Sequence, residues 1–103
     1  MGDDSDGTSG REDNGTARGV KPAVAIRNAR EQLSALLGRE PESVSALART
    51  DQGWTADVEV LELERIPDST SVLATYTVQL DADGDLIGYE RRRRYSRGQV
   101  DRR

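Results

Sequence analysis

Three acids surround a glycine in the run Asp81-Ala82-Asp83-Gly84-Asp85, an arrangement that could ligate calcium. An EF-hand loop needs glycine at its sixth position and glutamate at its twelfth. Counted from Asp81, the glycine is fourth and the twelfth residue is Arg92. The same residue types suit a tight turn. We therefore predict a β-hairpin turn here and no metal site.

Two glutamates on one predicted strand, Glu62 and Glu64, are the second candidate for chemistry. Glycosidase-type acid–base catalysis needs a cleft and one carboxyl with a raised pKa, and an open sheet face offers neither. The chain contains no histidine and no cysteine, so it lacks the commonest general base, the thiol nucleophile and the zinc thiolate. It also lacks a glycine-rich phosphate loop and a nucleophile elbow. We predict no catalytic residue and no cofactor.

The third candidate is the run Arg91-Arg92-Arg93-Arg94, followed by Tyr95 and Arg97. Clustered arginines neutralise phosphates and tyrosine stacks on bases, which makes nucleic acid one candidate partner. Residues 21–90, however, carry thirteen acids and six bases, whereas residues 91–103 carry one acid and seven bases. The acidic body would repel a phosphate backbone. Docking to another protein and charge balance within the sheet are the other two interpretations.

The position of the arginines on a strand bears on this choice. Because side chains alternate along a strand, the four arginines are divided between two faces. In the expected register Arg92 and Arg94 share the outer face with Glu62 and Glu64, two strands away. Arginines on an edge strand also deter pairing with another sheet.

Trp54 is the only tryptophan and begins a predicted strand just after a glycine turn. It is either a core residue or a docking hot spot. The candidate partner-binding residues are therefore Trp54, Arg91, Arg92, Arg93, Arg94, Tyr95 and Arg97.

A helix is predicted over Lys21–Leu37. Pro22 suits the first helical turn, Gly38 can end the helix, and Pro41 prevents its continuation. Residues three and four apart form one apolar stripe, which we expect to face the core. The stripe consists of Ile26, Ala29, Leu33, Leu36 and Leu37.

Strand patterns follow the helix. We predict strands at 44–49, 54–65, 72–80 and 86 to about 95, with turns at 51–53 and 81–84 and a loop at 66–71. The apolar residues of the second strand change parity, which indicates a β-bulge near 60–61 or a strand covered on both faces. Matching the apolar faces of the last two strands places Tyr89 opposite Tyr76. The same register places Ile87 opposite Val78.

These elements predict an α+β domain in which one N-terminal helix packs on a four-stranded antiparallel β-meander. We assign the domain to residues 20–97, where the apolar residues are concentrated. Residues 1–19 carry too few apolar side chains to offset chain entropy and should form a disordered acidic tail. Residues 98–103 should form a basic C-terminal tail. Since no membrane-spanning run or secretory signal is present, we expect a cytoplasmic protein with no membrane partner.

The series of motifs from Gly53 to Arg97 resembles the gas vesicle protein O family (GvpO), and the helix at 22–37 fits the same layout. The matching pieces, in order, are Gly53-Trp54, Val58-Glu59-Val60, Glu62-Leu63-Glu64-Arg65-Ile66-Pro67, Leu73-Ala74, Tyr76, Val78, Leu80-Asp81, Gly84, Leu86, Tyr89 and Arg94-Tyr95. A second, looser similarity is to PepSY-like modules. These also place a helix before a β-meander and carry a hairpin like that from Tyr76 to Gly84.

The GvpO resemblance implies a non-enzymatic accessory protein of gas vesicle formation whose partners are other gas vesicle proteins. With 34% hydrophobic and 33% charged residues, the chain is too polar for the main wall of a shell that excludes water. An assembly factor in the cytoplasm, associated with gas vesicles, fits better. The alternatives are a nucleic-acid-binding regulator that uses residues 91–103 and a PepSY-like binding or inhibitory module. No motif indicates a small-molecule ligand.

Overall fold

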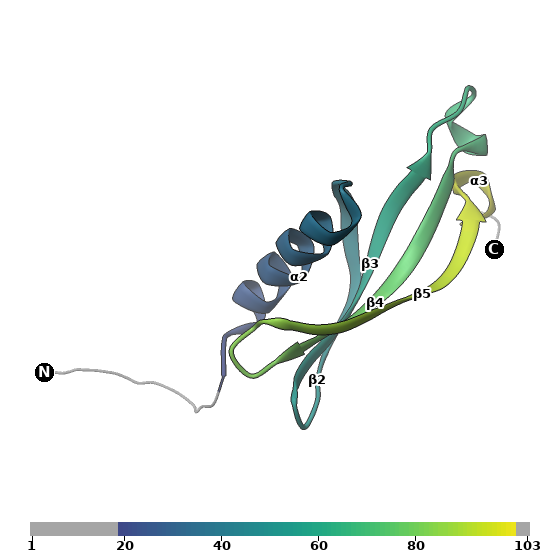
Figure 1. The fold of residues 1–103 in the computed structure, drawn as a ribbon. Helices are drawn as coiled ribbons and strands as arrows, with labels where there is room; N and C mark the ends of the chain where they lie inside the picture. The colour runs from purple at the N-terminus through teal and green to yellow at the C-terminus, as the bar shows by residue number, and fades with distance from the viewer. Residues whose placement is uncertain (1–18, 101–103) are drawn as a thin grey trace, which may run out of the picture.

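The computed structural model describes residues 19–100, in which one long helix packs on a four-stranded antiparallel sheet (Figure 1). The elements are α2 (Pro22–Leu37), β2 (Pro41–Arg49), β3 (Gly53–Leu63), the 3-10 turn η1 (Asp68–Thr70), β4 (Val72–Asp81), β5 (Leu86–Ser96) and α3 (Arg97–Val100). The strand order is β2-β3-β4-β5, a meander. The predicted α+β fold is confirmed. Of the predicted acidic tail, all but Gly19 lies outside the described residues.

Helix α2 ends at Leu37 as the sequence predicts and begins at Pro22, one residue after the predicted start. Gly38 adopts the left-handed conformation at φ 71°, and its N–H donates to the Ser34 carbonyl at 2.8 Å. The predicted apolar stripe is partly wrong, because Leu36 is 55% exposed. The helical residues that are fully buried are Ala25, Ala29 and Leu33. Two small alanines let the helix backbone approach the sheet closely, and the buried stripe is rotated away from Leu36.

The core lies between α2 and one face of the sheet. Along β3 the buried side chains alternate strictly with partly exposed ones, as expected for a strand with one buried face. The paired positions on β4 are also buried, so both central strands present the same apolar face to the helix. The strand residues of this core are Trp54, Ala56, Val58, Val60, Ala74, Tyr76, Val78 and Leu80.

β-Bulges change the register at several points. The bulge predicted near 60–61 is present one residue further on, where the pairing of β3 with β4 shifts between Leu61 and Leu63. Strand β5 carries two more extra residues, Ile87 and Arg92. Tyr89 therefore lies opposite Val78 rather than Tyr76, and the predicted register of this pair is wrong by two residues. Alternation of apolar residues does not reveal a bulge when exposed positions flank it.

Two strand boundaries and the C-terminal segment also differ from the prediction. Strand β2 begins at Pro41 rather than Val44, which is compatible with proline as the first residue of an edge strand. Strand β3 ends at Leu63, two residues early. Residues 97–100 form the short helix α3 where a basic tail was expected to begin, and residues 101–103 lie outside the described part.

The β4–β5 turn is hydrogen-bonded to α2 through two side chains, Asn28 and Gln32, which are four residues apart on the helix. The carbonyl of Gly84 accepts hydrogen bonds from Asn28 Nδ2 at 3.0 Å and from Gln32 Nε2 at 3.2 Å. Gln32 Oε1 in turn accepts from the Leu86 N–H at 2.7 Å. Within the turn, the Asp81 carboxylate accepts two backbone N–H groups. The helix is thus fixed over the turn end of the sheet, while the strands continue beyond it (Figure 1).

Candidate functional site

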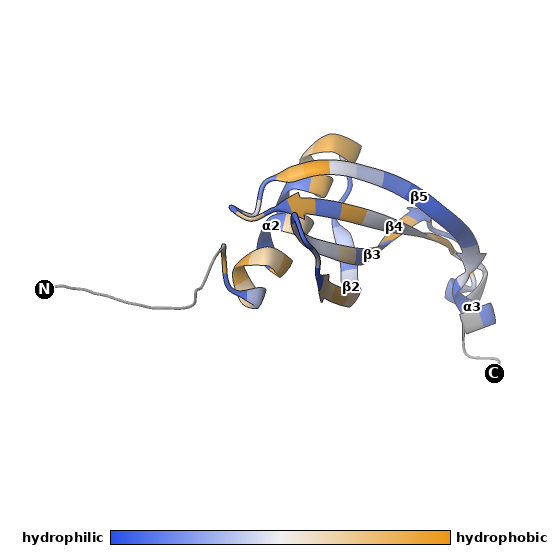
Figure 2. Ribbon diagram, turned by 90° about the horizontal axis from the view of Figure 1, so that it is seen from below, coloured by the Kyte–Doolittle hydropathy of each residue, from blue (hydrophilic) through white to orange (hydrophobic). Residues whose placement is uncertain are grey.

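The structure divides the predicted arginine run between the two faces of the sheet. Arg91 lies opposite Tyr76, whose side chain belongs to the core under α2. Arg94 lies opposite Ala74, on the same face. Arg93 faces the other side. Figure 2 shows the change along β5 from a hydrophobic beginning to this hydrophilic stretch.

Glu62 is the centre of a polar cluster on the helix-bearing face. Its Oε1 lies 3.2 Å from Arg91 Nη1 and 2.9 Å from Arg94 Nε, and its Oε2 accepts the Tyr76 hydroxyl at 2.9 Å. The Arg94–Glu62 pair spans the intervening strand above Ala74, whose small side chain leaves room for it. The side chain of Glu62 is only 14% exposed, whereas both arginines remain substantially accessible. Burial, together with the hydrogen bond to Glu62, raises the pKa of Tyr76.

The predicted pairing across the sheet is correct for one arginine and wrong for the other. Arg94 shares a face with Glu62, as expected, but this is the helix-bearing face and not the predicted outer face. Arg92 does not share it. Arg92 is the extra residue of a bulge and contacts Glu90 at 3.4 Å. Glu64 lies beyond the end of β3 and is exposed. The bulge therefore decides which arginines reach Glu62.

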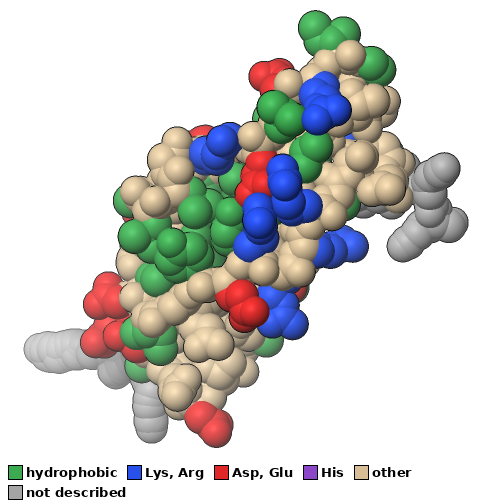
Figure 3. Space-filling view, turned by 45° about the vertical axis from the view of Figure 1, so that its right-hand side comes forward, with side chains coloured by type: hydrophobic (Ala, Val, Ile, Leu, Met, Phe, Trp, Pro, Cys, Tyr) green, Lys and Arg blue, Asp and Glu red, His purple; other side chains and the backbone are tan. Residues whose placement is uncertain are grey.

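The helix-bearing face continues past α2 as a partly uncovered surface, which we call the open face. Its exposed apolar side chains are Leu36, Leu63 and Tyr89, which are 55%, 43% and 44% exposed, and its charged side chains are Glu62, Arg65, Arg91 and Arg94. Leu63 is paired with Val72 and Tyr89 with Val78, which places both on this side of the sheet. Leu36 follows Gln32 by one helical turn, so it lies on the flank of α2 nearest β5. Figure 3 shows hydrophobic side chains gathered beside a group of basic and acidic ones.

A shallow hollow of about 390 Å³ lies at the far end of the open face. The residues that line it are Arg65, Val72, Arg94, Tyr95, Ser96 and Gln99. Two arginines therefore border one depression next to exposed apolar side chains.

On the face of the sheet opposite to the open face, the Glu59 carboxylate accepts hydrogen bonds from three hydroxyl groups. Ser45 donates at 2.6 Å and Thr75 at 2.7 Å, and Tyr95 donates to the same carboxylate. The Arg93 guanidinium lies 4.7 Å from the centre of the Tyr95 ring. Burial alone would raise the pKa of Glu59, but these hydrogen bonds and Arg93 outweigh it and lower the pKa. Burial and the bond to Glu59 raise the pKa of Tyr95 to about 12.

The raised pKa of Tyr95 predicts a pH-dependent stability. Because the pKa is about 12 when folded and about 10 when unfolded, this hydroxyl stabilises the fold fully below pH 10 and loses that effect as the pH rises toward 12. We expect Tyr95→Phe to lower the free energy of unfolding at pH 8 by about 1–3 kcal/mol, as for a hydrogen bond to a charged group. It should also flatten the decline above pH 10. Urea unfolding of both proteins from pH 8 to 12 measures this, and equal slopes would contradict the assignment.

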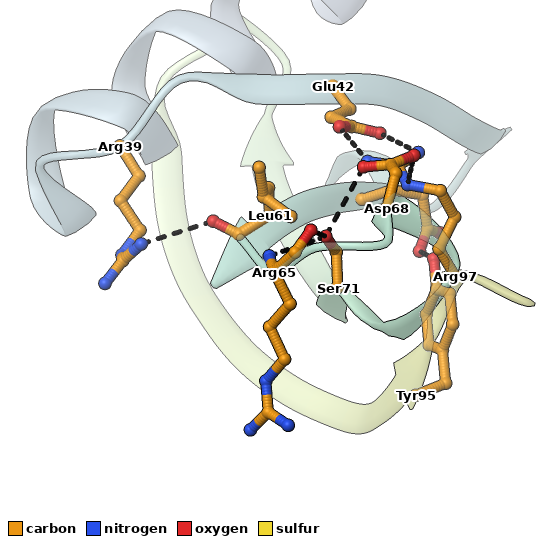
Figure 4. Close-up of polar contacts among 9 residues, drawn as sticks. Arg39, Glu42, Leu61, Arg65, Asp68, Ser71, Tyr95 and Arg97 are labelled. Atoms are coloured by element: carbon orange, nitrogen blue, oxygen red, sulfur yellow. Dashed lines mark hydrogen bonds and ion pairs between the residues drawn. The ribbon is translucent and has the colours of Figure 1, made fainter. Parts of the chain in front are cut away.

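Arg97 joins the ends of the two edge strands and differs in role from the arginine run (Figure 4). Its guanidinium contacts Glu42 on β2 through Nη2 at 2.6 Å and Nη1 at 3.1 Å, and Asp68 through Nε at 2.9 Å. Ser71, which is fully buried, accepts the Arg65 N–H at 3.0 Å in the same loop region. These contacts raise the pKa of Arg97, with Glu42 the largest cause. Arg97 therefore links β2 and the η1 turn to the end of β5, which is a structural role.

Trp54 is placed in the core. Its side chain is 5% exposed, and the Arg49 guanidinium covers its ring at 4.5 Å from the centroid. The structure therefore does not bring Trp54 together with the arginine run on one surface.

The sequence did not identify Leu63, Arg65 or Tyr89 as surface residues of a site, and it indicated Glu62 only as a catalytic candidate and as a charge partner of the arginines. A comparison of element lengths would have found this region. A helix of 16 residues extends about 24 Å, whereas an 11-residue strand such as β5 extends roughly 36 Å. One helix of this length leaves part of the sheet uncovered.

Within 19–100, no helix is long and apolar enough to cross a membrane. The same part of the chain holds no group of three or more acidic side chains arranged to bind a metal ion.

Comparison with known proteins gives consistent matches to one family. The family described as "Gas vesicle synthesis protein GvpO" matches residues 8–101. Gas vesicle protein O of a Streptomyces species is 57% identical over 79% of this chain and 63% of its own length. Gas vesicle protein O1 of Halobacterium salinarum is 37% identical over 74% of this chain and 64% of its own length. Gas vesicle protein O of Haloferax mediterranei is 37% identical over 70% and 52%.

The chain thus spans only about three fifths of the length of the first two of these relatives. No solved structure matches the chain. The family match covers all of the described residues, including the whole sheet and the open face. On these findings the chain belongs to the GvpO family of gas vesicle synthesis proteins.

Proposed function

We propose that this protein is a non-enzymatic accessory protein of gas vesicle formation that acts by binding other gas vesicle proteins. Its family is described by a role in gas vesicle synthesis, and the relatives named above are gas vesicle proteins. The proposal places it in the cytoplasm, in association with forming gas vesicles. The chain's polar composition supports an assembly role rather than a place as the main wall protein.

The observation that carries the binding role is the open face. It exposes Leu36, Leu63 and Tyr89 next to Arg91 and Arg94, whose guanidinium groups are accessible. Tyrosine and arginine are enriched at protein interfaces, where apolar anchors are surrounded by polar groups. Glu62 holds the two arginines in fixed positions, which lowers the entropy lost when a partner binds.

Nucleic acid receives less support as the partner. Among the described residues, Arg91 and Arg94 share one carboxylate, Arg92 contacts Glu90 and Arg97 contacts two acids. The acids beside these four arginines reduce the positive potential that would attract a phosphate backbone.

Neutralising the two arginines on the open face tests the proposal. We expect Arg91→Gln with Arg94→Gln to reduce recovery of gas vesicle proteins in an affinity pull-down roughly tenfold, since each exposed ion pair contributes up to about 1 kcal/mol. The matched control is Arg92→Gln with Arg93→Gln, which removes the same charge from the bulge and from the opposite face. The measurement is mass spectrometry of partners from cells that form gas vesicles.

The two double variants separate the possible outcomes. Equal losses in both would mean that only the net charge of the strand matters, which contradicts a defined docking face. Recovery of nucleic acid alone, with a steep salt dependence, would favour the regulator interpretation instead. Circular dichroism of each variant should show that the domain remains folded.

A further inference from the structure

We infer that the open face binds an amphipathic helix that carries an acidic flank and belongs to the partner protein. The inference rests on the proposed function and specifies the chemistry of the partner. Three features of the described residues support it. The helical layer leaves part of the sheet uncovered, the edge strands are bulged and one of them carries the arginine run, and the open face carries a net positive charge.

The second layer of this domain is incomplete. Helix α2 is fastened at the β4–β5 turn through Asn28 and Gln32 and buries Ala25, Ala29 and Leu33 against the sheet. Past the helix the strands continue (Figure 1), and apolar side chains remain exposed on this face (Figure 3). A sheet face with apolar side chains is normally covered by a helix or another sheet. An added helix beside α2 would complete the layer and cover Leu36, Leu63 and Tyr89.

The edges of the sheet argue against a partner that adds a strand. Edge strand β5 has bulges at Ile87 and Arg92 and carries the arginine run. Edge strand β2 has register shifts at Glu42 and Ser45. Bulges and charged side chains at edges prevent regular strand addition. The face of the sheet is therefore the available surface, and a helix is the element that covers it.

The charge of the open face selects an acidic helix. The open face carries three bases, Arg65, Arg91 and Arg94, and the single acid Glu62, so its net charge is opposite in sign to that of the whole chain, which is −4. The sign stays positive when the neighbouring Glu64 is included. Arg65 makes no ion pair with any other described residue, and it borders the same hollow as Arg94. A carboxylate of the partner placed between these two arginines would satisfy both.

These features specify the partner helix that would bind the open face. Its apolar residues, three and four apart, would contact Leu36, Tyr89 and Leu63, while aspartates or glutamates along one flank would reach Arg65 and Arg94. A second copy of this chain fits less well, because residues 22–37 contain more bases than acids. Their helix has no acidic flank to offer.

Site-specific photo-crosslinking in the full chain tests the inference. A benzophenone amino acid would replace Tyr89 or Leu63 on the open face, or Gln79, which is exposed on the opposite face, as a control. Cells that form gas vesicles would be irradiated and the crosslinked peptides identified. We expect crosslinks from positions 89 and 63 to an amphipathic segment with an acidic flank, and only background from position 79. Adding Arg65→Gln and Arg94→Gln should reduce the yield severalfold, whereas Arg92→Gln and Arg93→Gln should not.

The outcomes distinguish this inference from the proposed function. If gas vesicle proteins are recovered but crosslink only through Gln79, or through segments without acids, the inference is wrong while the proposed function stands. Crosslinks between two copies of this chain would also overturn it. If acidic amphipathic segments are captured from proteins unrelated to gas vesicles, the inference about chemistry holds and the proposed function fails.

Discussion

Replacing Gly53 with alanine is expected to lower the free energy of unfolding by about 3 kcal/mol or more. Gly53 begins β3 and is paired with Asp81 on β4. A Cβ atom at this position would overlap the carbonyl carbon and oxygen of Asp81 and the carbonyl oxygen of Leu80. These are backbone atoms of a central strand, so they cannot rotate away as a flexible side chain would. Strands β3 and β4 would have to separate where Gly53 pairs with Asp81, next to the β2–β3 and β4–β5 turns.

Gly88→Ala is the matched control. Gly88 lies within β5, and a Cβ atom there would meet no atom within 4 Å. We expect its effect to stay within about 0.5 kcal/mol. Urea unfolding followed by Trp54 fluorescence compares the two variants. Equal stability of both would show that β3 and β4 do not approach each other this closely at Gly53.

The second large effect is expected for Leu33→Ala, which should cost about 2–5 kcal/mol. Leu33 is fully buried and contributes the largest helical side chain to the core. Its neighbours on the buried stripe are Ala25 and Ala29, which are too small to fill the cavity. Domains of this size are stable by only about 5–15 kcal/mol, so a substantial fraction of the protein is expected to unfold on mild heating.

Leu36→Ala is the control on the same helix. Its side chain is 55% exposed, so the loss of apolar burial is small and the expected change is below about 1 kcal/mol. Leu33→Ala and Leu36→Ala together distinguish an effect on stability from an effect on partner binding, because Leu33 belongs to the core and Leu36 to the open face. Thermal unfolding and partner recovery should both be measured. A Leu36→Ala protein as unstable as Leu33→Ala would place Leu36 in the core and remove it from the open face.

Local sequence patterns were sufficient for most elements. Pro22 and Gly38 define the ends of α2, and the alternation in β4 and the Asp-Gly turn define the second hairpin. These signals act within a few residues of the chain, so no tertiary contact is needed to read them. The family resemblance also depended on an ordered series of residues, and the match over residues 8–101 confirmed it.

The composition of the candidate site was less predictable. The sequence grouped Arg94 with Glu62 correctly but on the outer face, added Arg92 to the same group and did not select Arg65 or Tyr89. The extra residue Arg92 in β5 brings Arg91 and Arg94, which are three residues apart, to the same face as Glu62, because each residue added to a strand reverses the faces that follow it. No local propensity marks where that extra residue is accommodated.

The sequence by itself determined the class of the domain, its helix, its meander and its family, because each follows from caps, turns and alternation along the chain. Only the tertiary structure decided which arginines share a face, that Leu36 is exposed and that part of the sheet is uncovered. These properties depend on bulges, on the rotation of α2 and on the difference in length between a helix and a strand. All three are set by packing between elements distant in sequence, where the energy of the whole core outweighs local preference.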